Sequence, residues 1–299
     1  MATKADPGTR ALAPQVAVVT DTTAYLPSEL ARELGIDLVS LYVNWDDHSE
    51  RESDMPNFDA FYGRLRGARR LPTTSQPSIG DFLAVFEPLV SAGRDIVSIH
   101  LSGGLSGTVD TARQAAERIA QGNGGGHVTV VDSSSISGGL ALVVLAAARG
   151  AATGSDADTV AQRARNARDE MKMWFALDTL EYLHRGGRIG GASAWLGSAL
   201  KIKPILTLEA QIVPVERVRT SGRLLQRLVD YAQQRKDDGC DAWLVQHIQA
   251  PDQAARLVES AQEIMGCPPV FVSEVGPVGG SHAGPGMLGI GAMPRKYLE

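Results

Sequence analysis

Three short segments of this chain place hydroxyl or histidine side chains beside glycines or a helix start, a pattern suited to binding an anion. The first is residues 73–78 (TTSQPS), whose hydroxyls come directly before an expected helix. The first N–H groups of a helix lack partners and lie at the positive end of its dipole, so they bind an anion without a cation. The alternative is that Ser78 only caps the helix, with Asp81 as its acidic partner, and the threonines form a turn.

The second segment is residues 101–108 (LSGGLSGT), in which Ser106 lies between Leu105 and Gly107. It is similar to the nucleophile elbow of hydrolases, but Thr108 stands where that motif has its last glycine. A hydroxyl in such a turn can instead donate a hydrogen bond to a bound carboxylate, which requires no activating base. A plain turn is the third interpretation.

The third segment is residues 276–286 (GPVGGSHAGPG), where glycines and prolines surround His282. Glycine permits close approach of a ligand to the backbone, and proline fixes the turn. His282 could donate a hydrogen bond to an anion or carry a proton. Otherwise it is an exposed histidine in a loop.

Residues 185–188 (RGGR) place two arginines around a glycine pair. Their planar guanidinium groups suit a phosphate or a partner's carboxylate, although salt bridges at a helix end would explain them equally well. The histidines are scattered, the acidic residues do not cluster, and neither a Walker A nor a dinucleotide motif occurs. We therefore expect no metal, no cofactor and no ATP site on this chain.

The three candidate segments must be positioned by regular secondary structure, and the sequence predicts strands that alternate with helices. Apolar runs at 16–20, 96–101 and 128–131 each end in a polar turn, which predicts strands of a largely parallel sheet with right-handed crossovers. The turns would then meet at the carboxyl edge of the sheet, where open α/β folds bind ligands. A further strand is expected at 36–43, and helices at 28–34, 58–65, 78–90, 109–120 and 136–149.

The second half of the chain alternates less regularly. We predict a flexible tail at 1–15, an N-terminal α/β lobe at 16–155 and a C-terminal α/β lobe at 156–299, since 151–158 is small and polar. Strands are expected at 174–177, 205–208, 212–218, 242–246 and 270–272, and helices at 158–171, 180–184, 222–235 and 252–263.

Composition restricts the classes of partner. The chain has 299 residues, 29 basic and 34 acidic, which gives a net charge of −5. It has no basic field for nucleic acid, so any anionic ligand must be bound locally. Cys240 and Cys267 match no redox or zinc motif, and no apolar run reaches the roughly 20 residues that span a bilayer. We expect a cytoplasmic protein whose aliphatic interior suits a flexible aliphatic guest as well as ordinary packing.

Seven segments, taken in order, resemble the DegV family of bacterial fatty-acid-binding proteins, and they run from residue 16 almost to the C-terminus. The resemblance implies an N-terminal lobe with a largely parallel, Rossmann-like sheet and a C-terminal α/β lobe with a mixed sheet. It also implies one bound long-chain fatty acid, such as palmitate or oleate, with the carboxylate near the lobe interface and the tail in an apolar tunnel. The segments are 20–23, 74–78, 105–108, 131–133, 180–189, 200–206 and 276–286.

The resemblance also implies roles for single residues. Thr74 and Ser106 would hold the carboxylate, with Ser75 and Gly107 beside them and His282 at the same polar end. Arg185 and Arg217 would contact the phosphoryl group or a kinase partner. The chain departs from the common family pattern at two positions, Gly103 instead of serine and Ala283 instead of threonine, and both departures remove hydroxyls near the expected carboxylate.

The function implied is that of the binding subunit of a bacterial fatty-acid kinase. Such a subunit presents its lipid to a separate ATP-dependent kinase, for phospholipid synthesis, and touches the membrane transiently. It is not itself an enzyme. The alternative is a serine esterase or thioesterase using Ser106, His282 and either Asp21 or Asp132. A phosphotransferase that phosphorylates His282 is a third reading, which rests on fold analogy.

Overall fold

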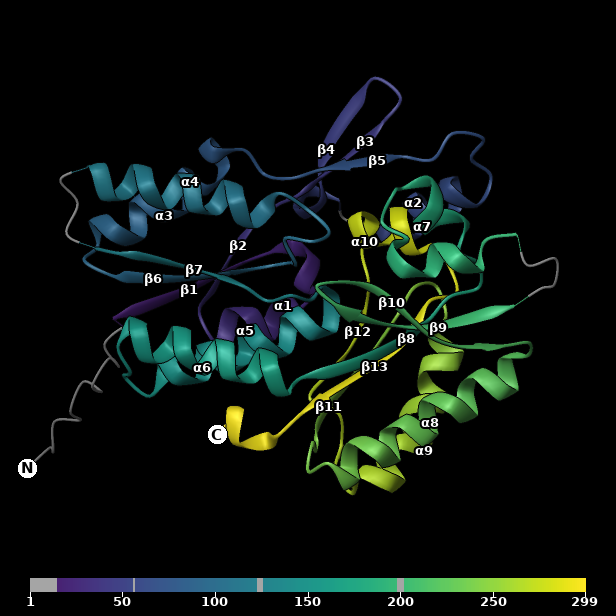
Figure 1. Cartoon of the computed structure of the whole chain (residues 1–299). Coiled ribbons are helices and arrows are strands. Elements are labelled where there is room, and N and C mark those ends of the chain that lie inside the picture. Colours follow the sequence, from purple (N-terminus) through teal and green to yellow (C-terminus); the bar gives the residue numbers. More distant parts are fainter. Residues whose placement is uncertain (1–14, 56, 123–125, 198–201) are drawn as a thin grey trace, which may run out of the picture.

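The computed structural model describes residues 15–55, 57–122, 126–197 and 202–299. The predicted tail, apart from residue 15, and the first two residues of segment 200–206 lie outside the described residues. Within the described part, helices and strands form a mixed α/β structure with two larger sheets and one small sheet (Figure 1).

The first sheet is parallel throughout, as predicted. Its order is β2-β1-β6-β7, and each pair of neighbours is parallel. Helices α3 and α4 cover one face, and α5 and α6 cover the other (Figure 1). The elements are β1 (Val16–Asp21), β2 (Ile36–Val39), β6 (Asp95–His100), β7 (Val128–Asp132), α3 (Ile79–Ser91), α4 (Thr108–Gln121), α5 (Ser137–Ala152) and α6 (Ala157–Glu170).

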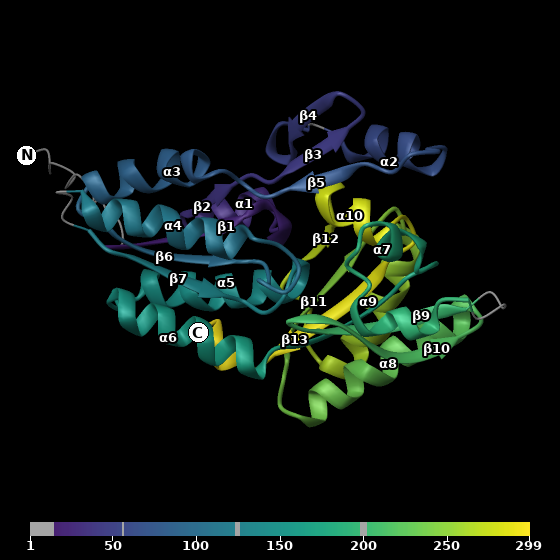
Figure 2. The same ribbon diagram turned by 45° about the horizontal axis from the view of Figure 1, so that its top comes forward.

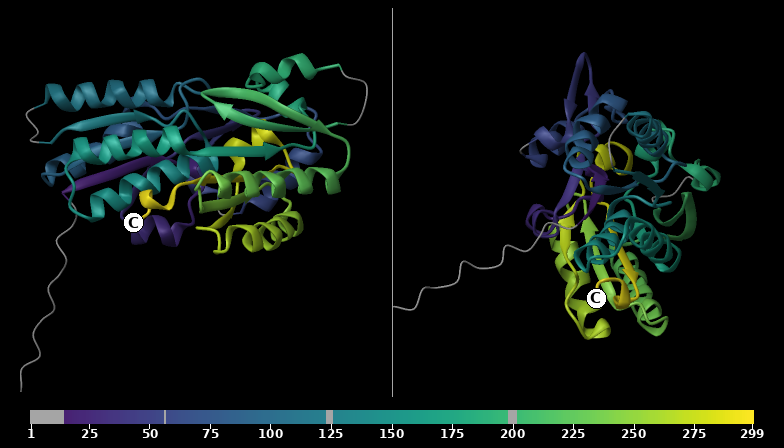
Figure 3. Two further views of the ribbon diagram at one scale, coloured as in Figure 1. Left: turned by 60° about the horizontal axis from the view of Figure 1, so that its bottom comes forward. Right: turned by 90° about the vertical axis from the view of Figure 1, so that its left-hand side faces the viewer.

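The second sheet is mixed and has the order β10-β9-β8-β13-β11-β12. Only β11 and β12 pair in parallel among its neighbours. Helices α8 and α9 pack together on one face, where the left view of Figure 3 shows them side by side. The elements are β8 (Lys172–Ala176), β9 (Lys203–Glu209), β10 (Gln211–Val218), β11 (Ala242–His247), β12 (Val272–Glu274), β13 (Leu288–Met293), α8 (Ser221–Asp237) and α9 (Pro251–Met265).

Helix α5 joins the two sheets. It contacts β1 and β6 of the first sheet and β8, β11 and β13 of the second. Nearly all its residues are buried, and the sequence SGGLALVVLAAARGAA is apolar on every side. A helix that is apolar all round is one that is covered all round, which here is the result of its position between two sheets.

A small antiparallel sheet with the order β4-β3-β5 corrects two predictions. The single strand predicted at 36–43 is two strands, because the chain leaves the first sheet after β2 and enters the small sheet as β3. Residues 73–75 form a strand rather than a turn, since they pair with β3. The elements are β3 (Tyr42–Trp45), β4 (His48–Arg51), β5 (Thr73–Ser75) and the neighbouring helix α2 (Phe58–Arg66).

The last part of the chain differs most from prediction. The segment 276–286, expected to be a loop, contains the helix α10 (Pro277–Ala283), and β13, which follows it, was not predicted. Both elements contain glycines, which obscure the helix and strand patterns in the sequence. Figure 2 shows α10 between the small sheet and α7 (Glu181–Arg185). The other elements are α1 (Ser28–Glu33) and the 3-10 helices η1 (Thr22–Ala24), η2 (Glu52–Asp54), η3 (Gly190–Trp195) and η4 (Arg295–Tyr297).

The boundary between lobes after residue 155 stays a proposal. Helix α6, which begins just beyond it, packs against α5 and lies beside β6 and β7, whereas the second sheet begins with β8. Among the described residues, no helix has both the length and the hydropathy required to cross a bilayer.

Candidate functional site

A cavity of about 380 Å³ lies between the two larger sheets, at the carboxyl edge of the first. This volume is within the range of about 300 to 1,000 Å³ that is usual for small-molecule sites. Its walls are mainly aliphatic, with some methionine and one phenylalanine. They are formed by Leu41, Leu101, Leu105, Ile136, Met173, Phe175, Leu183, Leu208, Ile212, Val275, Val278, Ala283 and Met287.

The cavity is also lined by polar side chains, and its lining includes all five of the predicted ligand residues, Thr74, Ser75, Ser106, Gly107 and His282. They come from distant parts of the chain, namely β5, the loop before α4, and α10. The structure therefore brings the three candidate segments together. Ser75 is exposed, so this polar part of the cavity reaches the surface.

The hydroxyl of Thr74 and the ring of His282 are in direct contact. Thr74 Oγ1 lies 2.8 Å from His282 Nε2. Burial, together with the nearby positive charge of Arg188, lowers the pKa of His282 to about 4, and burial is the larger cause. The imidazole is therefore neutral at physiological pH. Its other nitrogen, Nδ1, is buried without a hydrogen-bond partner among the described residues.

Ser106 contributes to the start of α4 as well as to the cavity. Its Oγ accepts a hydrogen bond from the N–H of Thr108 at 3.3 Å and lies 2.9 Å from Thr108 Oγ1. The side chain of Gln76 lies against Gly107, where an added Cβ would come within 2.3 Å of Gln76 Oε1. Gln76 also lines the cavity and donates to Thr111 at 2.7 Å, so it connects the Thr74 and Ser106 segments.

Gly186 leaves the space that His282 occupies, because an added Cβ would lie 2.2 Å from His282 Nδ1. Its φ of −77° is open to any residue, so Gly186→Ala tests the contact without backbone strain. We expect the variant to lose about 1–3 kcal/mol of unfolding free energy, the usual cost of overpacking, in a urea titration. The control is Gly63→Ala in α2, which has open space around it and should gain stability slightly. Equal stabilities of the two variants would contradict the contact.

Arg188 lines the cavity and was not among the predicted ligands, although the RGGR segment signalled it. Its guanidinium donates to the carbonyl oxygens of Leu105, at 3.2 Å, and Gly186, at 2.7 Å. In the described part of the chain no carboxylate pairs with it. It therefore supplies positive potential beside His282.

The two predicted arginines lie elsewhere. Arg185 is 47% exposed and pairs with Glu181 on its own helix at 3.3 Å. The Arg217 guanidinium lies over the ring of Trp195, 5.3 Å from its centroid. Neither lines the cavity.

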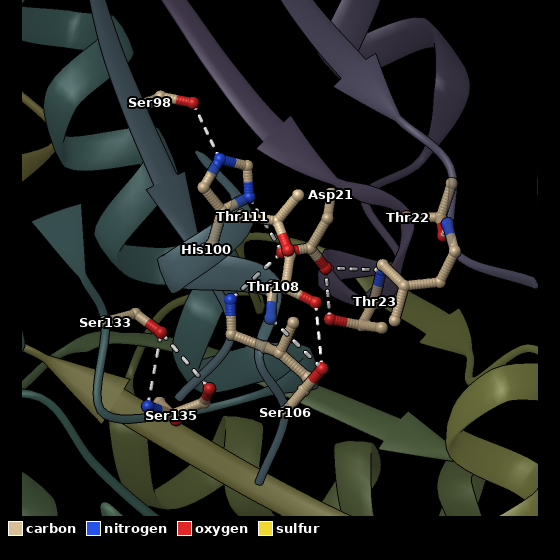
Figure 4. A network of polar contacts seen from close by, with 12 residues as sticks. Asp21, Thr22, Thr23, Ser98, His100, Ser106, Thr108, Thr111, Ser133 and Ser135 are labelled. Carbon is tan, nitrogen blue, oxygen red and sulfur yellow. Dashed lines mark hydrogen bonds and ion pairs between the residues drawn. The ribbon is translucent and has the colours of Figure 1, made fainter. Parts of the chain in front are cut away.

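A buried network below the cavity was not predicted (Figure 4). Asp21 Oδ2 lies 3.0 Å from His100 Nδ1 and accepts the N–H of Leu101 at 3.0 Å, while His100 Nε2 lies 2.6 Å from Ser98 Oγ. Asp21 Oδ1 accepts from the N–H of Thr23 at 3.1 Å and from its hydroxyl. The side chains of Asp21 and His100 are 0% exposed. Because Leu101 lines the cavity, this network fixes the start of the loop that carries Ser106.

The structure does not assemble the catalytic relay that the esterase alternative needs. Ser106 contacts Thr108, and His282 contacts Thr74. Asp21 is bound to His100, and Asp132 accepts from the N–H groups of Gly103 and Ser134. A Cβ at Gly103 would come 3.0 Å from Asp132 Oδ2, a tight contact with the end of that side chain.

Comparisons with known proteins agree on one family. The DegV family model, described as "Uncharacterised protein, DegV family", matches residues 15–295. A DegV domain-containing protein of Streptomyces coelicolor is 39% identical over 278 residues, covering 92% of this chain and 97% of that protein.

Two solved structures are similar over most of their length. One is a DegV family protein from Thermus thermophilus described by its fatty acid binding, with 33% identity, a TM-score of 0.83 and coverage of 93% of this chain and 99% of that one. The other is DegV from Bacillus subtilis, described as a fatty acid binding protein, with 31% identity, a TM-score of 0.83 and the same coverage of 93% and 99%.

Proposed function

Since the chain belongs to the DegV family, we propose that it binds one long-chain fatty acid in the cavity and presents the carboxylate to a separate ATP-dependent kinase. The observation that carries the proposal is a cavity with aliphatic walls and one polar group of Thr74, Ser106 and His282. The relatives from Thermus thermophilus and Bacillus subtilis, both described by fatty acid binding, support it.

The aliphatic walls would supply most of the affinity. Burial of about 15 methylenes at about 0.8 kcal/mol each offers on the order of 12 kcal/mol before the costs of association and ordering. Leucine, isoleucine and methionine walls suit a flexible chain such as palmitate or oleate, because they offer dispersion contacts without polar groups that the chain would leave unpaired.

The polar group would hold the carboxylate. A buried carboxylate is costly unless it accepts hydrogen bonds. The hydroxyls of Thr74 and Ser106 can donate to it, with Ser75 and Gly107 beside them and neutral His282 behind Thr74. Arg188 adds positive potential at the edge of the site. Hydroxyl donors, unlike a bidentate arginine, leave a carboxylate oxygen nucleophilic.

The reaction would take place in a complex with the kinase. A carboxylate oxygen attacks the terminal phosphorus of ATP, an O–P bond forms, the bond to the ADP oxygen breaks, and an acyl phosphate results. The exposed Ser75 supports this role, because the polar part of the cavity reaches the surface there. We place this step in the cytoplasm, where the acyl phosphate feeds phospholipid synthesis after transient contact of the protein with the membrane.

The binding step is tested by denaturing mass spectrometry of lipid extracted from purified protein. We expect a long-chain fatty acid at about one per chain, and its repeated absence would overturn the proposal. A fluorophosphonate probe provides the second arm, because covalent labelling of Ser106 would support the esterase instead.

The kinase step predicts a role for Arg185. Acyl phosphate, trapped as a hydroxamate, is the readout, with ATP and a catalytic subunit of a fatty-acid kinase added. Arg185→Ala should reduce its formation about ten-fold, the value of one charge-assisted contact, while lipid binding is retained. The control is Arg113→Ala, an equally exposed helical arginine that pairs with Asp110 at 2.8 Å. Equal rates for the two variants would exclude Arg185 from the contact.

A further inference from the structure

The amino end of α10 is held by side chains from the first lobe. Glu52 Oε1 accepts hydrogen bonds from the N–H of Val278 at 2.8 Å and from the hydroxyl of Tyr25 at 3.1 Å. The Tyr25 oxygen in turn accepts from the N–H of Gly279 at 2.7 Å. Glu52 therefore binds the backbone of α10 directly and, through Tyr25, a second time.

These bonds reach the wall of the cavity. Val278 and Gly279, whose N–H groups they engage, both line it, and His282 follows one helical turn later on α10. Tyr62 holds the same end of the helix by donating to the carbonyl oxygen of Gly276 at 2.9 Å. A change at Glu52 thus acts on the wall that bears the polar group.

Glu52 is an unusual residue to find at this position. It is 3% exposed, and its second oxygen, Oε2, has no hydrogen-bond partner among the described residues. Burial is the main cause that raises the pKa of Glu52 to about 7, and the negative charge of Asp21 acts in the same direction, although the hydrogen bonds from Val278 and Tyr25 oppose the shift. Glu52 therefore changes charge near neutral pH.

The groups that face Glu52 do not compensate its charge. From the first lobe these are Asp21, Tyr25 and Tyr62, and burial raises the pKa of both tyrosines, so they remain neutral. From α10 only backbone N–H groups face it. On its own segment, Arg51 is bound to Asp81 instead.

We propose that Glu52 is a positioning residue of the lipid site, whose protonated form favours binding of an anionic lipid and whose ionised form opposes it. This inference rests on the proposed function. An ionised Glu52 would add a second negative charge behind the wall that faces the bound carboxylate, and like charges disfavour each other. By linkage, the bound lipid would hold Glu52 in its protonated form.

The test is the affinity for palmitate, measured by displacement of a fluorescent fatty acid, at pH 6 and pH 8. Glu52→Gln keeps the shape and remains neutral. For each protein we divide the affinity at pH 6 by the affinity at pH 8. We expect this ratio to be at least about five times larger in the unaltered protein than in Glu52→Gln, which is the low end of typical coupling. The comparison cancels the titration of palmitate itself. Glu50→Gln, two residues earlier on β4, is the control and should behave like the unaltered protein.

Each outcome is distinguishable. Equal pH profiles of Glu52→Gln and the unaltered protein, with binding intact, would overturn this inference alone. Absence of binding at either pH in all three proteins would overturn the proposed function. If Glu52→Gln does not fold, the inference is tested by infrared titration of the Glu52 carboxyl in the unaltered protein. We expect palmitate to raise the midpoint of this titration. An unchanged midpoint would overturn the inference.

Discussion

The double variant Thr74→Val, Ser106→Ala is expected to bind long-chain fatty acids about 10²- to 10⁴-fold more weakly than the unaltered protein. Each hydrogen bond to a charged group contributes about 1.5–3 kcal/mol, and the carboxylate would lose two of them. The aliphatic walls remain, so the loss falls on the head group alone. The Kd for palmitate, from fluorescent displacement, is the measurement.

The control for this variant changes one threonine and one serine outside the cavity. Thr159 and Ser49 are exposed, so Thr159→Val, Ser49→Ala should bind palmitate with unaltered affinity. The methyl ester of palmitic acid gives an independent check, because it lacks the charge that the hydroxyls would stabilise. If the double variant and the control bind palmitate equally, Thr74 and Ser106 do not hold the carboxylate.

Asp21→Ala is expected to reduce the free energy of unfolding by about 3–5 kcal/mol, because each buried donor that loses its acceptor costs about 1–3 kcal/mol. The substitution would leave His100 and the N–H groups of Leu101 and Thr23 without their acceptor in a region that water does not reach. Urea titration followed by circular dichroism measures the effect.

The matched control is Asp169→Ala on α6. Asp169 is 65% exposed and pairs with Arg168 at 2.8 Å, and exposed pairs of this kind contribute little. Its unfolding midpoint should coincide with that of the unaltered protein. If Asp21→Ala unfolds at that same midpoint, the network in Figure 4 does not stabilise the fold.

The regular part of the fold could be predicted because its signals are local. Strands β1, β6 and β7 are short apolar runs that end in polar turns, and the parallel order follows from their alternation with helices. Strands β9 and β10 were predicted for the same reason. Helix α3 begins with the expected capping box, in which Ser78 accepts from the N–H of Asp81 at 3.1 Å.

The elements that were missed depend on distant contacts. Strand β13 has the sequence LGIGAM, and only its pairing with β8 and β11 makes it a strand. Helix α10 is rich in glycine and holds its shape because Tyr25, Glu52 and Tyr62 bind its amino end. Local propensity favours neither structure.

The same distinction applies to the candidate site. Thr74, Ser106 and His282 lie in segments whose composition is conspicuous, so sequence reasoning located them. Glu52 and His100 stand in ordinary surroundings in the sequence, and their environments arise only from folding. Such residues can be found only from coordinates.

Helix α5 has a consequence for the molecule as a whole. Since one helix serves as the interior of both sheets, neither half can swing away from the other without uncovering it. If the proposed fatty acid binds, its entry and exit would therefore depend on displacement of local surface segments rather than on the opening of a hinge. The halves also cannot be exchanged between relatives as independent modules, because the apolar surface of α5 is covered by both halves.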